Sequence, residues 1–193
     1  DASYHLILLS ENEKGYKNLL KLVTKGYLEG FYYKPRIDKE LLVEYSEGLI
    51  ALSSCVRGEV AHNVNRENVP RAIKVASQYV EIMGEGNFFL ELQNHQLENQ
   101  DRINKEIIGI GKKLGLPVVA TNNCHYIDRE DYRAHEILLC LQTGKTISDP
   151  YRMQYPSDEF YFKSPKEMIA LFKETPEAIE NTLKIAERCE LEL

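Results

Sequence analysis

The sequence predicts an α/β fold in which parallel strands are covered by helices. Over the first two thirds of the chain, short apolar runs alternate with longer segments that have helical periodicity. The apolar runs are nearly continuous and do not alternate with polar residues, as is typical of strands buried on both faces. Together these two observations favour a parallel sheet between layers of helices.

The expected strands are four apolar runs. They cover residues 4–10, 48–55 and 87–95 and the run that begins at residue 118. The last three runs end in polar side chains or a cysteine, whereas in the first run His5 stands at the start. Functional groups of α/β folds gather at the carboxyl ends of parallel strands, so these ends form the candidate site. Its residues are Ser53, Ser54, Cys55, Asn94, His95, Asn122, Asn123, Cys124 and His125.

Helices are expected between these strands. Residues 13–27 form the first, with an apolar face of Leu19, Leu20, Val23 and Leu28. Asp38 is the expected N-cap of a short second helix. Residues 58–84 form a helix in two parts, broken near residues 68–70. Residues 100–116 form an amphipathic helix with one apolar face, made by Ile103, Ile107, Ile110 and Leu114.

After residue 130 the pattern becomes helical without strands. Helices are expected over residues 131–147, 164–174 and 175–191, with a Tyr- and Pro-rich connection at 148–162. Ser164 and Thr175 each precede a proline, which is typical of an N-cap followed by the first helical residue.

Length and charge limit the classes of function. The chain has 193 residues, 43% of them hydrophobic and 28% charged, as in a soluble protein of one domain or one domain with an appendage. The formal net charge of -6 argues against a protein that binds DNA over its whole surface. The net charge does not exclude a catalytic pocket that admits the end of one DNA strand.

The sequence favours a cytoplasmic protein that does not enter the membrane. It contains no run of about eighteen apolar residues, and residues 1–10 lack the order of a signal peptide. Its four cysteines show no C-x-x-C spacing, which argues against a structural zinc knuckle. We expect reduced thiols, mostly packed in the core.

The candidate chemistry is metal binding. His5, Cys55, His95 and His125 come one from each expected strand, and imidazole and thiolate are zinc-type ligands. A single histidine at a strand edge is nevertheless more often a hydrogen-bonded structural residue. The residues alone therefore indicate an α/β domain with an incomplete set of metal ligands.

Carboxylates, which bridge cations in hydrolytic sites, are scarce near these strand ends. Glu59 and Glu91 are the available candidates. No phosphate-binding Gly-rich loop and no Ser-His-Asp arrangement with usable spacing occurs.

Long stretches of the chain carry a resemblance to a known family. They read "YHLILLSENEKGYKNLLKLVTKGYLEGFYYKPRID", "GLIALSSCVRGEV", "NFFLELQNHQLENQ", "VVATNNCHYIDREDYRAHEILLCLQTGKTISD" and "FYFKSPKEMIALFKETPEAIENTLKIAERC". In this order they resemble the PHP (polymerase and histidinol phosphatase) domain of bacterial replicative DNA polymerases, the DNA polymerase III alpha family. The resemblance covers essentially the whole chain.

The resemblance implies a distorted (β/α)7 barrel with a trinuclear metal cluster at the carboxyl ends of its strands. The family's first motifs, a His-x-His, an Asp-His pair and a Glu, do not occur here. We therefore expect a partial barrel plus a C-terminal helical extension. Residues 1–134 would be the later part of the PHP domain, and residues 135–193 its helical end leading toward a polymerase palm. Exposed apolar surface is expected where the first strands would pack.

The resemblance also implies the site residues. His5, Cys55 and His125 match metal-ligand positions of the family, and Asn123 stands where the family has an aspartate. An amide oxygen can coordinate a metal but neither neutralises a cation nor acts as a general base. The complete domain would bind divalent zinc, manganese or magnesium, and this chain would hold an incomplete site.

The implied function is that of a parent DNA-directed DNA polymerase, a nucleotidyltransferase. The PHP part would support the polymerase fold and carry a metal-dependent 3′–5′ exonuclease, while this chain alone would be inactive. Implied partners, all through the parent, are DNA, the sliding clamp, the clamp loader and the proofreading subunit. Two alternatives stay open: a scaffold without chemistry, and a free-standing PHP phosphoesterase, which the helical tail at 164–189 disfavours.

Overall fold

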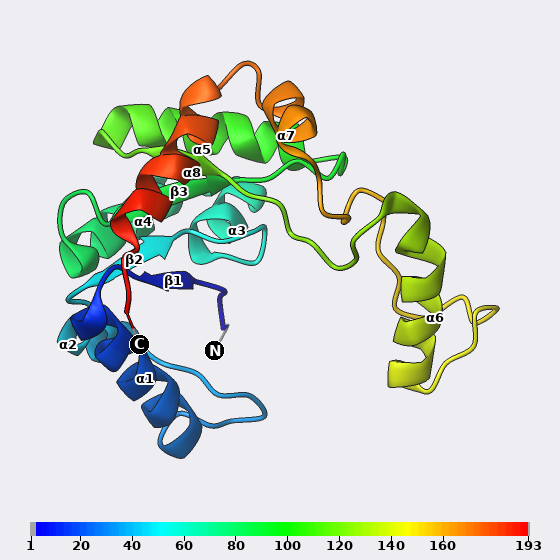
Figure 1. The fold of residues 1–193 in the computed structure, drawn as a ribbon, viewed down its shortest axis with the longest axis horizontal. Coiled ribbons are helices and arrows are strands. Elements are labelled where there is room, and N and C mark those ends of the chain that lie inside the picture. The colour runs from blue at the N-terminus through cyan, green and yellow to red at the C-terminus, as the bar shows by residue number, and fades with distance from the viewer. Residues whose placement is uncertain (1–2, 193) are drawn as a thin grey trace.

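A mixed four-stranded sheet organises the chain, of which the computed structural model describes residues 3–192 (Figure 1). The strands are β1 (Ile7–Ser10), β2 (Leu49–Leu52), β3 (Phe88–Leu92) and β4 (Val118–Ala120), in that spatial order. β2, β3 and β4 are parallel, as expected. β1 pairs with β2 in the antiparallel direction, so the expectation of an all-parallel sheet is wrong at this strand.

The helices follow the expected order along the chain. They are α1 (Glu13–Leu28), α2 (Lys39–Glu44), α3 (Glu59–Asn65), α4 (Val69–Met83), α5 (Gln100–Leu114), the 3-10 helix η1 (Arg129–Asp131), α6 (Tyr132–Thr143), α7 (Pro165–Leu171) and α8 (Pro176–Arg188). α6 ends before the expected residue 147 because Gly144 takes a left-handed conformation and caps it.

The antiparallel direction of β1 follows from a tight contact between α1 and the start of β2. A Cβ atom on Gly15 would lie 1.7 Å from the carbonyl oxygen of Gly48, so the backbones approach as closely as glycine permits. The Asn18 side chain donates a hydrogen bond to the carbonyl of Glu47 at 2.9 Å. The N–H of Glu11 donates to the carbonyl of Gly48 at 2.9 Å. β2 therefore starts beside the end of β1.

The same contact changes the buried face of α1. The sequence favoured Leu20, Val23 and Leu28 as part of the core face, but they are 49%, 52% and 79% exposed. The helix instead buries a stripe of mostly small residues, Gly15, Asn18, Leu22 and Gly26. Small side chains occupy the buried face because they let the helix lie close to the chain that enters β2.

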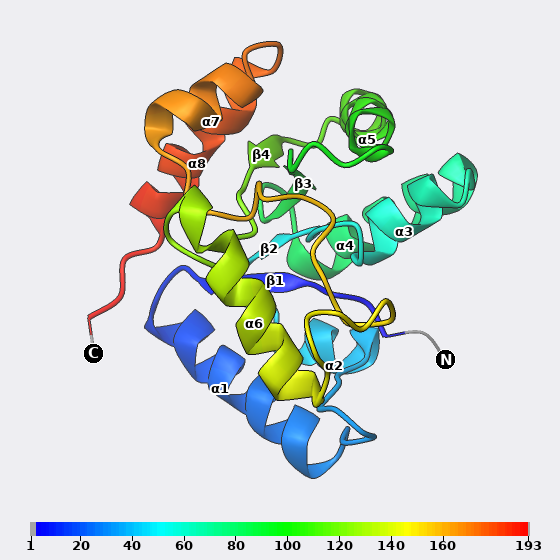
Figure 2. The same cartoon turned by 90° about the vertical axis from the view of Figure 1, so that its right-hand side faces the viewer.

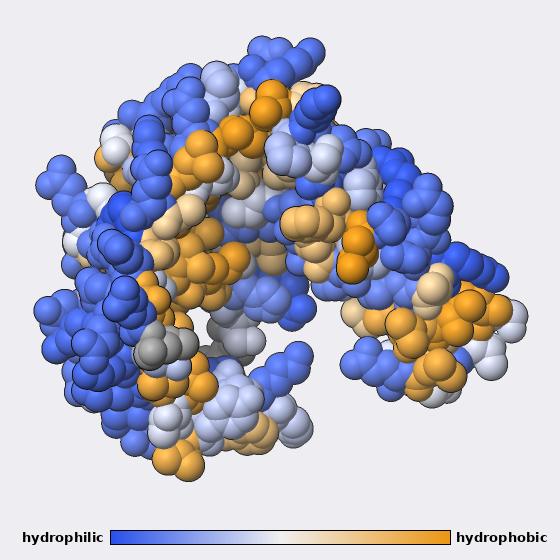
Figure 3. Space-filling model, viewed as in Figure 1, coloured by the Kyte–Doolittle hydropathy of each residue, from blue (hydrophilic) through white to orange (hydrophobic). Residues whose placement is uncertain are grey.

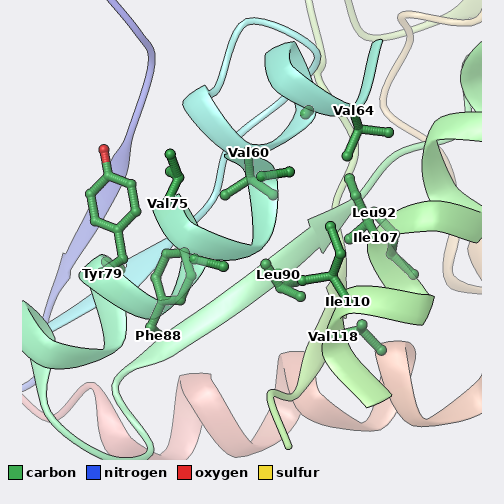
Figure 4. Packing of buried hydrophobic residues seen from close by; sticks show 14 of the residues in the cluster. Val60, Val64, Val75, Tyr79, Phe88, Leu90, Leu92, Ile107, Ile110 and Val118 are labelled. Atoms are coloured by element: carbon green, nitrogen blue, oxygen red, sulfur yellow. The ribbon is translucent and has the colours of Figure 1, made fainter. Parts of the chain in front are cut away.

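Apolar side chains fill both faces of the sheet. Figure 4 shows the larger core, in which Phe88, Leu90 and Leu92 of β3 pack against α3, α4 and α5. The opposite face packs Phe89 with neighbouring strand residues and with Ile185 of α8. The continuous apolar runs of β2, β3 and β4 are therefore buried on both sides, as predicted.

Helix caps and thiols match the expectations in part. The Asp38 side chain accepts from the N–H of Leu41 at 2.8 Å, and Ser164 forms a capping box with Glu167. Thr175 occupies the N-cap of α8 but makes no side-chain capping hydrogen bond. The expectation that most thiols lie in the core is wrong, because only Cys140 of the four is buried.

α6 stands apart from the sheet and its covering helices in Figure 1, and in Figure 2, turned by 90°, it lies toward the viewer in front of them. Figure 3 shows the molecule hollowed between this arm and the side that carries α1, with apolar residues along part of the hollow. No helix within residues 3–192 is long and apolar enough to cross a membrane.

α8 fastens the C-terminal part of the chain to the sheet. The buried Asn181 side chain donates a hydrogen bond to the carbonyl of Val118 in β4 at 2.7 Å. At the other end of the helix, Arg188 donates to Glu11 at 2.8 Å and to the carbonyl of Gly86 at 2.7 Å. The Asn181 bond holds β4, whose end carries part of the candidate site, and the Arg188 bonds hold the segments after β1 and before β3.

We predict that Asn181→Leu lowers the free energy of unfolding by about 1–3 kcal/mol, because leucine leaves the buried carbonyl of Val118 without a donor. Urea denaturation measures this change. Glu180→Ala, at an exposed position one residue earlier, is the control and should change stability by less than about 0.5 kcal/mol. Equal stability of the two variants would contradict the role given to Asn181.

Candidate functional site

The first half of the candidate site is a pair formed by His5 and Cys55. Because β1 runs against β2, the start of β1 lies at the same edge of the sheet as the end of β2. The N–H of His5 donates to the carbonyl of Arg57 at 3.1 Å, and Nδ1 of His5 lies 3.9 Å from Sγ of Cys55. The position of His5 at the start of its strand is thereby explained.

This pair fits one edge of a tetrahedral zinc site. Ordinary Zn–S and Zn–N bond lengths at a tetrahedral angle place sulfur and nitrogen about 3.5 Å apart, close to the observed separation. Partial loss of hydration lowers the pKa of His5, and the positive charges of Arg57 and Lys34 lower it further. The imidazole is therefore neutral at pH 7 and can donate a lone pair.

A closed metal site needs more ligands than this pair. Across residues 3–192, no three His, Cys, Asp or Glu side chains come together in a metal-binding group. The described residues thus supply only part of the ligand set that a bound metal needs. The pair alone therefore supports no reaction step on a metal.

The second half of the candidate site is the turn after β4, which His95 holds in place. The N–H of Asn123 donates to Nε2 of His95 at 3.2 Å. The His95 ring is buried and stacks on Phe160, with ring centroids 4.4 Å apart. Burial lowers the pKa of His95 to about 4, and the charge of Lys163 acts in the same direction. His95 is therefore a neutral acceptor that fixes the backbone next to His125.

His125 lies in an aromatic cluster that the sequence did not reveal. The Tyr155 hydroxyl is 2.9 Å from its Nε2, and the rings of His135 and Phe160 both have centroids 5.8 Å from its own. Burial lowers the pKa of His125, as does nearby His135. Three of the neighbours come from α6 or from the connection at 148–162, where no spacing pattern pointed to the site.

The two candidate carboxylates have structural partners. Glu59 pairs with Lys39 at 2.8 Å and accepts from the Tyr79 hydroxyl at 3.1 Å. Glu91 is only 2% exposed, and its Oε1 accepts from Gln93 at 2.7 Å and from Thr121 at 2.5 Å. Burial raises the pKa of Glu91, although both hydrogen bonds oppose the rise. Neither carboxylate meets His5 and Cys55 as a third ligand.

An open groove lies away from the His5–Cys55 pair. It has a volume of about 1050 Å³ and lies between η1, α7 and α8, with Ile127, Met168 and Leu183 among its lining residues. Among its charged side chains, Arg129 pairs with Glu159 at 2.7 Å. The groove is mainly apolar and brings no catalytic groups together.

Comparisons with known proteins agree with the resemblance seen in the sequence. Residues 1–95 match the family model described as PHP domain. The chain is 46% identical over 188 residues to the DNA polymerase III subunit alpha of Borreliella burgdorferi, covering 97% of this chain and 16% of that protein. It is 44% identical over 190 residues to the same subunit of Treponema pallidum and 43% identical over 193 residues to that of Thermus aquaticus.

Each of the latter two matches covers 98% of this chain and 16% of the relative, so the chain spans about a sixth of the length of these proteins. The similarity therefore concerns nearly all of this chain and one part of much longer proteins. Residues 1–95 of the chain match the PHP domain family, and nearly its whole length is homologous to one part of the DNA polymerase III alpha subunits.

Proposed function

We propose that the chain is the PHP part of a bacterial replicative DNA polymerase, whose whole protein adds deoxynucleotides to a primer end. The observation that supports this most strongly is the identity of 41–46% to DNA polymerase III alpha subunits over about 98% of the chain. The intact protein would act on DNA together with a sliding clamp, a clamp loader and a proofreading subunit.

The proposed division of the chain has its boundary within α6. Residues 1–134 form the later part of the PHP domain, and residues 135–193 form its helical end, which leads toward the polymerase domain. The packing of α8 against β4 supports this arrangement, because it makes the helical end a brace for the sheet.

The proposed role of the strand-end edge is metal binding by His5 and Cys55 at the end of β2, with Asn123 and His125 on the turn after β4, two strands further along the sheet. Zinc is favoured over magnesium, because thiolate and imidazole are poor ligands for a hard cation. When bound, such a metal would activate water for phosphodiester hydrolysis. The chain's own contribution is to orient the imidazole and thiolate at the edge of the sheet.

A second candidate function is that of a scaffold without chemistry. Asn123 favours it, because an amide cannot neutralise a cation or accept a proton as a general base. His125 favours it too, since its Nε2 lies 2.9 Å from the Tyr155 hydroxyl and has a partner within the protein. As a scaffold, the chain would use the residues at the strand-end edge to hold its own structure, and the domain would support the fold of the polymerase.

We predict that the full-length protein carrying this sequence extends a primed DNA template with deoxynucleotides. Gel analysis of primer extension measures this activity. His125→Ala should leave primer extension within about twofold, because the PHP part does not hold the polymerising groups. A full-length protein without templated incorporation would contradict the proposed function.

We also predict that the chain binds Co²⁺, as a spectroscopic substitute for zinc, through Cys55 and His5. The bound ion should show a thiolate-to-cobalt charge-transfer band. Cys55→Ser should abolish the band, and His5→Ala should weaken cobalt affinity about tenfold or more. Absorption titration measures both effects.

Cys189→Ser is the matched thiol control, because Cys189 is also a half-buried free thiol but caps α8. It should leave the cobalt band unchanged. A band that survives Cys55→Ser, or no cobalt binding by the unaltered chain, would contradict the metal role and favour the scaffold.

A further inference from the structure

One face of α6 is buried against the connection that follows the helix. Glu136, Leu139 and Cys140 are the buried residues of α6, and they recur at the i, i+3, i+4 spacing of one helix face. The Glu136 carboxylate accepts a hydrogen bond from Arg152 of the connection at 2.8 Å. The connection therefore lies against this face, and α6 has a small interior of its own.

The opposite face of α6 is apolar and exposed. Ile137, Leu138 and Leu141 are 47%, 62% and 74% exposed, and Ala134 is exposed one turn earlier. Their spacing of i, i+3, i+4 and i+7 places them in one row along the helix. We call these four residues the α6 stripe.

The α6 stripe lies on a part of the chain that stands clear of the sheet. In Figure 1, α6 occupies one end of the molecule, and Figure 3 shows apolar residues across much of the surface there. A contiguous apolar patch is uncommon on the surface of a monomer and marks an interaction site. A helical partner suits such a row, because an apolar helix face packs into the side chains of another.

The shape of the α6 stripe is complementary to itself. In an antiparallel pair of α6 helices centred between Ile137 and Leu138, these two residues face each other across the pair. Ala134 of one copy then lies opposite Leu141 of the second copy. Facing positions that combine a small with a large side chain interdigitate without leaving a void.

The charges that flank the α6 stripe match in the same register. Glu130 lies just before α6 and Lys145 just after it, so the antiparallel pair sets each one opposite the other. Glu130 forms no ion pair with any residue between 3 and 192. Lys145 pairs with Asp149 at 3.0 Å, but its side chain is 42% exposed and can turn toward a second carboxylate.

The same charges disfavour a parallel pair. Parallel helices would set Glu130 beside Glu130 and Lys145 beside Lys145, and like charges in such positions repel. Antiparallel helices also place the positive end of one helix dipole beside the negative end of the other. Charge and shape thus favour one arrangement, and the sequence of α6 itself supplies both of its sides.

We propose that the α6 stripe binds a second copy of this chain, and that the two α6 helices pack antiparallel about a two-fold axis. The contact is small, since four apolar residues a side compare with about 20–30 residues a side in a standard interface. The dimer should therefore be weak, with a Kd on the order of 10–100 µM. The proposal goes beyond the proposed function and does not depend on it.

The first test is the mass of the 193-residue chain, measured by sedimentation equilibrium over a range of concentrations. The weight-average mass should rise from the 22.3 kDa of one chain toward twice that value. Leu138→Glu and Leu141→Glu should each weaken association about tenfold or more, because they place a charge in the centre of the contact.

Leu28→Glu is the matched control, because Leu28 is also an exposed leucine of a helix, 79% exposed on α1. It should leave the Kd of the dimer unchanged. All three substitutions are at exposed positions, so Tm should stay within a few degrees of that of the unaltered chain. This separates loss of association from loss of the fold.

The register is tested by exchanging charges. Glu130→Lys and Lys145→Glu should each weaken the dimer about threefold or more, because two-fold symmetry puts each like-charge contact into the dimer twice. The double variant with both substitutions should recover the affinity of the unaltered chain, since it restores opposite charges across the pair. A merely structural role of either residue would not give this recovery.

Disulfide cross-linking tests the direction of the helices. The background carries serine in place of Cys55, Cys124 and Cys189. A mixture of Ala134→Cys and Leu141→Cys chains, one of them tagged, should form a cross-linked heterodimer under mild oxidation. Either variant alone should cross-link about fivefold less, because in the antiparallel pair residue 134 faces residue 141 and not its own copy.

Three results would overturn the inference. One is a mass of a single chain up to about 500 µM, which would leave the stripe to another part of the parent protein. Another is association that Leu138→Glu and Leu141→Glu leave intact, which would place the contact elsewhere. The last is preferential cross-linking of Ala134→Cys with itself, which would show parallel helices. None of these results bears on primer extension or cobalt binding, so the proposed function stands or falls separately.

Discussion

The antiparallel pairing of β1 with β2 is the constraint on which the candidate site depends. In a parallel sheet the carboxyl ends of the strands share one edge, and a residue at the start of a strand lies at the opposite edge. His5 stands at the start of β1, and it reaches Cys55 only because β1 runs the other way. The close approach of Gly15 to Gly48 holds this direction, because it leaves the start of β2 beside the end of β1.

A buried polar network makes the rest of this edge rigid. Ser53 Oγ accepts from the N–H of Glu91 at 2.8 Å, and the Glu91 carboxyl accepts from Gln93 and Thr121. These bonds join the ends of β2, β3 and β4, whereas the second carboxylate oxygen of Glu91 is buried without a hydrogen-bond partner among the described residues. The turn that carries Asn123 is held further by His95. The edge thus presents its side chains on a fixed frame.

Local sequence patterns predicted the elements better than their arrangement. The apolar runs gave β2, β3 and β4 because burial on both faces is visible in sequence, and the face of α5 with Ile103 and Ile107 was correct for the same reason. The direction of β1 was missed, because strand direction depends on contacts between residues far apart. The face of α1 was missed because glycine and asparagine, not leucine, allow its close packing.

Only the His5–Cys55 half of the candidate site could be predicted together with its contact. His5 and Cys55 were named, and they do lie together, whereas the neighbours of His125 were not foreseen. Tyr155 and Phe160 come from a connection without periodicity, which no local rule assigns to a strand end.

Solution NMR of the isotope-labelled chain tests the antiparallel pairing of β1 with β2, by measuring contacts between α-protons of the two strands. Antiparallel pairing should give cross-peaks in the register in which Ile7 faces Leu52 and Leu9 faces Ile50, so that residue numbers fall on one strand as they rise on the other. Cross-peaks in which both numbers rise together would show parallel pairing. Parallel pairing would separate His5 from Cys55 and remove the basis of the candidate site.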